Sequence, residues 1–159
     1  VTLYLRKEDY ITVTPAWDLI LANKRIFVGK HRIRDTFAGY ANSQLKKMEM
    51  FNKQGYMGDK RAKLVKEFGI DTKNASHCIR LLKMGIEFLR DGEPKIWRTD
   101  DREELLGIKR GSMTLEQVKA YGDKLFKQLN DEYEKSKLPE LVNKYDVNKL
   151  LYDVMEMVL

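Results

Sequence analysis

Residues 71–94 read DTKNASHCIRLLKMGIEFLRDGEP and contain the clearest helix signal in the chain. Asp71 and Thr72 supply an N-cap, and the glycine and proline at 92 and 94 end the helix near Arg90. Apolar residues share one arc of this helix at a spacing of three or four, namely Ala75, Ile79, Leu82, Ile86 and Leu89. The stretch therefore predicts an amphipathic helix whose apolar arc faces a core.

The opposite arc of this helix carries potential cations. Lys73, His77 and Arg80 are spaced i, i+4 and i+7, so their side chains fall within about 60° of arc. Arginine can bind phosphate oxygens bidentately and lysine binds them as a point charge. The row predicts a phosphate-binding face, although a solvated polar face would show the same spacing.

The same reasoning predicts further helices outward from this stretch, over 15–23, 35–52, 60–68, 101–107, 114–137 and 146–158. Thr14-Pro15 and the Thr114–Gln117 capping box mark two of the starts, and residues 54–59 break the second helix. Residues 3–5 and 10–14 are β-branched and aromatic, which predicts a short hairpin or the last strand of a sheet begun elsewhere.

The predicted fold is mainly α, a helical bundle-like domain with short strands over 1–14 and a helical domain over 15–159. The chain has 159 residues, of which 43% are hydrophobic and 34% charged, typical of a globular domain. No apolar run approaches the roughly 18 residues of a membrane span, and the first residues show no secretion signal. Its single cysteine, Cys78, excludes an internal disulfide and a cysteine-based metal cage, so we expect a cytoplasmic protein.

The net charge of +6 favours an acidic partner such as nucleic acid or nucleotide phosphate. A second basic cluster, interleaved with Ile26, Phe27 and Ile33, consists of Lys24, Arg25, Lys30, His31, Arg32 and Arg34. Such a cluster can bind nucleic acid, and it can equally be a solvated loop. Tyr40 and Gln44 lie one helical turn apart and could hydrogen-bond a base or sugar, although such residues more often edge a core.

The chain contains no complete active site. Gly111-Ser112 is not followed by Asp-x-Asp, and the adjacent carboxylates of Asp100 and Asp101 point apart, so a shared Mg²⁺ is not expected. The sequence has no Walker A loop, dinucleotide-binding fingerprint, nucleophile elbow or zinc motif. We therefore predict no catalytic residue and no metal ligand in this chain.

Several separated motifs together resemble a family of predicted nucleotidyltransferases of the DNA polymerase beta superfamily, found in bacteria and phages and in part linked to RNA repair. The central one is Asp71-x-Lys73-x-Ala75-x-His77-x-x-Arg80-Leu81-Leu82-x-x-Gly85. The others are Phe27-Val28-Gly29-Lys30, the run from Phe37 to Lys46, Gly92, Asp101-x-Glu103-x-Leu105-Leu106-x-Ile108-x-x-Gly111, Leu138-Pro139 and Leu150-Leu151. Gly29 departs from the family pattern, where serine is expected before the lysine.

The resemblance implies that the chain is the helical C-terminal portion of such an enzyme. The Gly-Ser and Asp-x-Asp motifs of the family lie in an N-terminal α/β catalytic domain, and the strands over 1–14 would be the tail of its sheet. The full enzyme would use NTP and Mg²⁺ to transfer a nucleotidyl group, whereas this chain alone is expected to be inactive. Lys73 and Arg80 would contact phosphate, His77 would orient a phosphate or a neighbouring carboxylate, and Lys30, Tyr40 and Gln44 would be second-rank residues of the same cleft.

Two alternatives remain. The chain could be a stand-alone nucleic-acid-binding helical module, with an affinity that falls steeply as salt rises. It could instead be an interaction domain whose polar helix face docks against a partner, in which case Lys73, His77 and Arg80 should be paired with acidic side chains.

Overall fold

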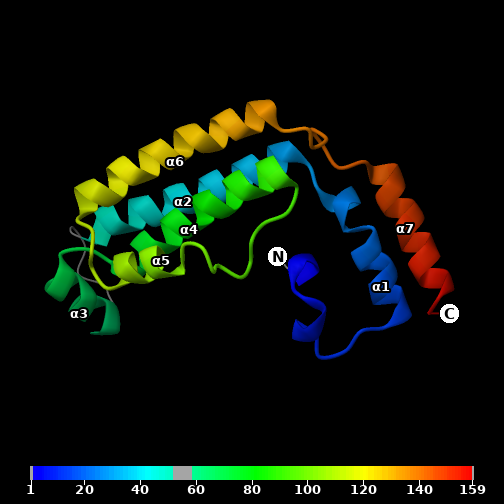
Figure 1. Ribbon diagram of the computed structural model, residues 1–159, viewed down its shortest axis with the longest axis horizontal. Helices are drawn as coiled ribbons and strands as arrows, with labels where there is room; N and C mark the ends of the chain where they lie inside the picture. The colour runs from blue at the N-terminus through cyan, green and yellow to red at the C-terminus, as the bar shows by residue number, and fades with distance from the viewer. Residues whose placement is uncertain (1, 52–58, 159) are drawn as a thin grey trace.

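The computed structural model describes residues 2–51 and 59–158, and this part of the chain is mainly helical (Figure 1). Its α-helices are α1 (Pro15–Ala22), α2 (Lys30–Phe51), α3 (Asp59–Phe68), α4 (Thr72–Asp91), α5 (Arg102–Lys109), α6 (Leu115–Lys135) and α7 (Lys144–Glu156). Short 3₁₀ turns cover Thr2–Tyr4, Lys7–Asp9 and Lys24–Phe27. The predicted helical bundle is confirmed.

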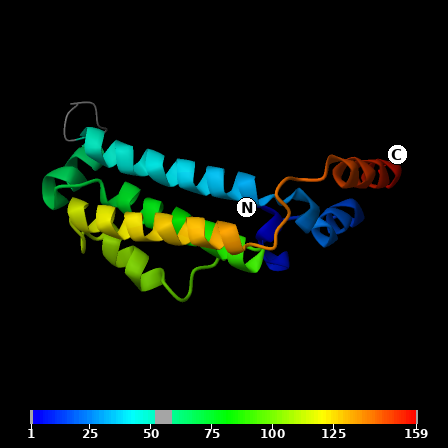
Figure 2. The ribbon, with the colours of Figure 1, turned by 90° about the horizontal axis from the view of Figure 1, so that it is seen from above.

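Helices α2, α4 and α6 pack side by side along most of their length, and α5 lies against α4 (Figure 1). Their shared core is built from the predicted apolar arc of α4, in which Ala75, Ile79 and Leu82 are fully buried. Viewed from above, α1 and α7 pair with each other and extend away from this bundle (Figure 2). Helix α4 is therefore surrounded on several sides, and Lys73, His77 and Arg80 lie on the part of it that stays exposed.

Local signals set most of the helix boundaries. The Asp71 carboxylate accepts a hydrogen bond from the Asn74 backbone amide at 3.0 Å and begins α4, and Gly92 ends that helix with φ of 78°. Thr14 caps α1 through the amide of Trp17, and the Thr114 capping box begins α6 as predicted. The expected break at residues 54–59 falls almost wholly on residues outside the described part.

The β-hairpin expected over residues 3–5 and 10–14 is wrong, because the described residues there form 3₁₀ turns and extended coil rather than strands. The Arg6 side chain pairs with Asp9 and closes a turn at 3.0 Å. Tyr4 packs edge-on against Phe88 of α4 with 5.2 Å between ring centroids. The aromatic residues that suggested strands therefore pack against helices and against one another.

Helix α2 begins five positions before the predicted residue 35, and its cap comes from a distant segment. The backbone amides of Lys30 and His31 donate to the carbonyls of Pro139 and Glu140 at 2.8 and 3.3 Å. A Cβ at Gly29 would lie 3.1 Å from the backbone nitrogen of Val142, so a larger residue would crowd this segment. The last helix begins at Lys144, two positions before the predicted residue 146, and is capped by Asn143.

Gly85 permits the close packing of α4 against α2 and α6. A Cβ at this position would lie 2.8 Å from Cβ of Phe37 and 2.9 Å from Cδ1 of Leu129. Gly85→Ala should therefore lower the free energy of unfolding by about 1–3 kcal/mol, because the added methyl group overpacks the core. Urea unfolding followed by circular dichroism measures this loss.

Gly39 on α2 is the matched control, since a Cβ there would meet no atom within 4 Å. Gly39→Ala should raise the free energy of unfolding by about 0.5–1 kcal/mol through reduced backbone entropy of the unfolded chain. Equal effects of the two substitutions would contradict the close packing of α4.

Candidate functional site

The candidate site is the outer face of α4, where the structure places Lys73, His77 and Arg80. All three residues are exposed, whereas Ile79 and Leu82 on the opposite arc are fully buried. In the described part of the chain no acidic side chain lies within 4.0 Å of any of the three. The interaction-domain alternative, in which a docked partner would pair these cations with acids, stays a prediction.

The electrostatic surroundings of His77 show that these cations repel one another. Partial burial lowers the pKa of His77, and the positive charges of Arg80, Lys47 and Lys73 lower it further. His77 is therefore neutral at pH 7 in the free protein. Lys47, on α2, belongs to the same face although the sequence analysis did not single it out.

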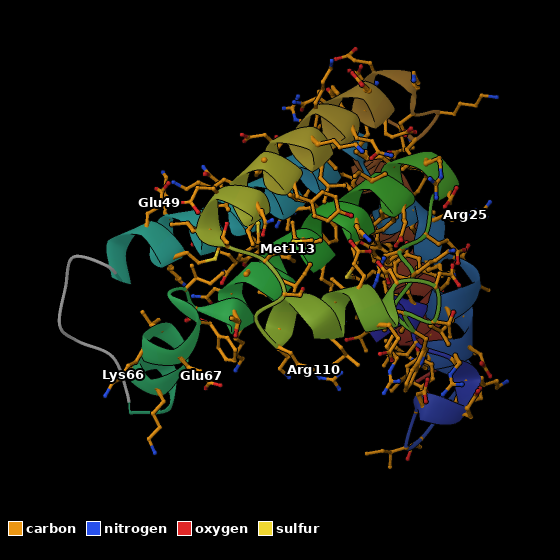
Figure 3. All side chains as sticks on the ribbon, turned by 60° about the vertical axis from the view of Figure 1, so that its left-hand side comes forward. Arg25, Glu49, Lys66, Glu67, Arg110 and Met113 are labelled. Carbon is orange, nitrogen blue, oxygen red and sulfur yellow. The ribbon has the colours of Figure 1, made fainter. Side chains whose placement is uncertain are left out.

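Helix α5 adds a second basic row beside the first. The Ser76 hydroxyl donates to the Leu105 carbonyl at 2.9 Å, and Lys83 lies 3.2 Å from Asp101, so α5 runs antiparallel to α4. Arg102 and Lys109 lie at i and i+7 on the outward side of α5. Beyond them, Figure 3 shows the Arg110 side chain projecting outward at the end of α5.

An open hollow of about 310 Å³ separates the two rows. Its lining combines apolar side chains with cations: Ser76, Arg80, Ile96, Trp97, Arg98, Arg102, Leu105, Leu106 and Lys109. The hollow therefore joins the predicted row on α4 to residues of α5 and of the segment between these helices.

Trp97 forms one wall of the hollow and is held in place from outside it. Its indole Nε1–H donates to the Asp9 carboxylate at 3.1 Å, and the Arg6 guanidinium lies 4.3 Å from the ring centroid. The residue nevertheless remains 56% exposed. A large aromatic ring is thus fixed at the surface with much of its area available to a ligand.

A largely buried ion network lies where the 95–101 segment meets α4. Arg98 contacts Glu87 of α4 at 2.8 Å and Asp101 at 2.6 Å, and its side chain is only 9% exposed. Lys83 bridges the same Asp101 and Glu104, and Glu104 also accepts from the Tyr121 hydroxyl of α6 at 2.7 Å. Each of these three acids bonds Lys83 or Arg98, and none lies within 4.0 Å of Lys73, His77 or Arg80 in the described part of the chain.

The structure does not bring Lys30 into this site. Its ammonium lies 3.5 Å from Glu140 and 5.1 Å from the centroid of the Tyr133 ring. Lys30 is 17 positions before Lys47 on the same helix, which places it about 25 Å away along the axis. Much of the second basic cluster is likewise paired, since Lys24 contacts Glu93 at 3.1 Å.

Tyr40 and Gln44 differ in their availability to a ligand. Both lie on α2 between Phe37, which faces Gly85 of α4, and Lys47, which faces His77. Gln44 is only 8% exposed and edges the core, whereas Tyr40 is 61% exposed. Of these two candidates, Tyr40 alone presents its side chain to solvent.

Several residues of this face escaped the sequence analysis. Arg102 and Lys109 repeat the i, i+7 spacing of Lys73 and Arg80, so the same periodicity argument applied to the helix near 101–107 could have found them. Trp97 lies in irregular chain, where no periodicity exists. Its position at the hollow depends on contacts with residues near position 9.

The described residues bring together no group of three or more histidine, cysteine, aspartate or glutamate side chains suited to a metal ion. The adjacent carboxylates of Asp100 and Asp101 bond different cations, Lys95 for the former and Arg98 with Lys83 for the latter. The Mg²⁺ that the family resemblance implies would bind carboxylates of a separate catalytic domain, and this stays a prediction. No helix of the described chain is long and apolar enough to cross a membrane.

Comparisons with protein-family models, with curated proteins and with solved structures each find no match to this chain.

The ion network predicts a specific acid sensitivity. Hydrogen bonds from Arg98, aided by Lys83, lower the pKa of Asp101 to about 2. This ionised carboxylate stabilises the fold by about 2 kcal/mol above pH 4, near its unfolded pKa, and the contribution is lost as the pH falls from about 4 to 2. Asp101→Asn should remove that part of the pH dependence of unfolding, measured by urea titrations at several pH values.

Asp100→Asn is the control, because Asp100 is exposed and bonds only Lys95 and its neighbour Thr99. This change should leave the stability at pH 7 nearly unaltered. A similar loss for both variants would show that the network does not stabilise the 95–101 segment.

Proposed function

We propose that the outer face of α4 and α5 binds the phosphates of a nucleotide or nucleic acid, and that the chain acts as the helical portion of a nucleotidyltransferase. The observation that carries the proposal is the exposed row of Lys73, His77 and Arg80, for which the described residues provide no acidic partner within 4.0 Å. Like charges held together on one face cost free energy, and an anionic ligand would relieve that repulsion.

The dimensions of the row suit a chain of phosphates. Lys73 and Arg80 are seven residues apart on one helix, a rise of about 10 Å. That length exceeds a single phosphate group and matches several linked ones. Arg80 offers a planar fork for bidentate contacts, and Lys73 offers a mobile point charge.

The reason for proposing nucleotidyl transfer is the sequence motif of residues 71–85, which contains this row. The motif divides between two roles: Ala75 and Leu82 are buried in the core, and Lys73, His77 and Arg80 are exposed. In such a reaction an acceptor oxygen attacks the α-phosphorus of an NTP and pyrophosphate leaves. Lys73 and Arg80 would hold the phosphates, while a catalytic domain with Gly-Ser and Asp-x-Asp motifs would supply the metal-binding carboxylates.

A second candidate function is a stand-alone nucleic-acid-binding module. The observation that favours it is the extension of the basic face onto α5, with an exposed tryptophan between the rows. Basic grooves with aromatic side chains are typical of proteins that bind single-stranded nucleic acid. The two candidates share the phosphate contacts and differ in whether a catalytic partner is required.

Replacing both Lys73 and Arg80 with alanine should weaken binding of inorganic tripolyphosphate and of oligothymidylate at least tenfold, because two phosphate contacts are lost. The slope of log affinity against log salt concentration should also become shallower by about 1–2. Fluorescence anisotropy with labelled oligothymidylate, with tripolyphosphate as competitor, measures both quantities.

The control is Lys127→Ala with Lys135→Ala on α6, which removes the same net charge from exposed positions on another helix. Binding should change less than threefold in this variant. If the two double variants weaken binding equally, the affinity comes from net charge and the α4 face is not the site.

His77 predicts a pH dependence of phosphate binding. Its pKa is lowered by burial and by Arg80, Lys47 and Lys73, so it is neutral at pH 7 and gains a proton only in mild acid. Since a bound phosphodiester favours the protonated ring, the affinity for oligothymidylate should rise as the pH falls from 7 to 5. In His77→Gln this rise should be absent, and its persistence would remove His77 from the site.

A further inference from the structure

We infer that the hollow between α4 and α5 is a base-binding subsite, in which Trp97 stacks on a base of single-stranded nucleic acid. This inference rests on the proposed function, because the row on α4 would hold the phosphates of the same strand. It adds the substrate class that fills the whole face: a strand with exposed bases.

The construction of the hollow suits a planar, partly apolar ring. Leu105 and Ser76 lie in its lining, and Ile96 and Leu106 add apolar surface beside Trp97. Its volume of about 310 Å³ is at the lower end of the range of ligand pockets, roughly 300–1,000 Å³. A flat base can enter such a shallow site and pack against its apolar side chains, while the cations of the lining remain for the phosphates beside that base.

Trp97 is oriented as a stacking platform. Its polar edge is occupied by the hydrogen bond to Asp9, and one face of the ring is covered by the Arg6 guanidinium. These contacts fix the indole without burying it, because the residue stays 56% exposed. A ring held in advance loses little conformational entropy when a base stacks on it.

The cations around the hollow would hold the sugar-phosphate backbone of the strand on both sides of the stacked base. Arg80 belongs both to the row on α4 and to the lining of the hollow. Arg102 contacts only the exposed neighbour Glu103, at 3.4 Å, a pair that solvent screens strongly. Lys109 has no acid within 4.0 Å among the described residues, and Arg98 is neutralised by Glu87 and Asp101.

A single strand would use more of this face than the simpler ligands would. A free triphosphate would need the row on α4 alone and would leave Trp97, Arg102 and Lys109 unused. The bases of a duplex are stacked on one another, so they cannot stack on Trp97 without being flipped out. A single strand uses the phosphate row and the aromatic wall together, as single-strand-binding grooves do.

The test compares two probes of equal length and equal phosphate charge: oligothymidylate and an abasic oligodeoxyribonucleotide. Trp97→Ala should weaken binding of oligothymidylate about tenfold and leave binding of the abasic strand within twofold, because only the first probe has bases to stack. Trp97→Tyr should restore most of the loss. Circular dichroism and thermal unfolding verify that the variants are folded.

Tryptophan emission provides a second readout in the Trp17→Phe background, where Trp97 is the remaining tryptophan. Oligothymidylate should quench this emission, and the abasic strand should quench it little. Arg6→Ala is a further control, since it removes the guanidinium from the ring and leaves the ring itself; oligothymidylate should still bind and quench.

The outcomes separate this inference from the proposed function. If Lys73→Ala with Arg80→Ala weakens both probes but Trp97→Ala weakens neither, the phosphate face stands and the base subsite is wrong. If Trp97→Ala lowers the affinity for both probes equally, the base subsite is also wrong, because the effect is then structural. If neither probe binds the unaltered chain, the proposed function fails together with the inference.

Discussion

The packing of α4 against α2, α5 and α6 is the constraint on which the rest of the structure depends. Gly85 lets the helix approach Phe37 of α2 and Leu129 of α6 closely, and the apolar arc around it is buried. A helix of 20 residues buried along one arc must present the opposite arc to solvent or to a partner. The exposure of Lys73, His77 and Arg80 is therefore a direct consequence of how the core is built.

The second constraint is that the acidic side chains near α5 bond Lys83 and Arg98, whereas the outer side of α5 carries basic side chains. Lys83 and Arg98 pair with acids from α4, from the start of α5 and from the segment between them, and this network ties the 95–101 segment to the bundle. Because these acids bond Lys83 and Arg98, the basic rows on the outer side of α4 and α5 keep their positive charge. The same segment carries Trp97, and its anchoring positions the indole beside Arg80.

Much of the helical architecture could be read from local signals, because caps, glycines and helical periodicity act within a few residues. The N-caps of α1, α4 and α6 and the glycine at the end of α4 were all predictable in this way. The N-terminal turns were mistaken for strands because Tyr4 and Tyr10 have β propensity, which their packing against Phe88 and Trp17 overrides. The start of α2 could not be read locally, because carbonyls of residues 139 and 140 cap it.

The composition of the basic row on α4 follows from spacing alone, since residues at i, i+4 and i+7 share a face wherever the helix lies. Its environment was decided by tertiary packing. The fold separates Lys30 from that row by the length of α2, buries Gln44, and adds Lys47, Arg102, Lys109 and Trp97 from other segments. A one-dimensional pattern specifies the directions of side chains within a helix, whereas which helices meet depends on long-range contacts that no local spacing encodes.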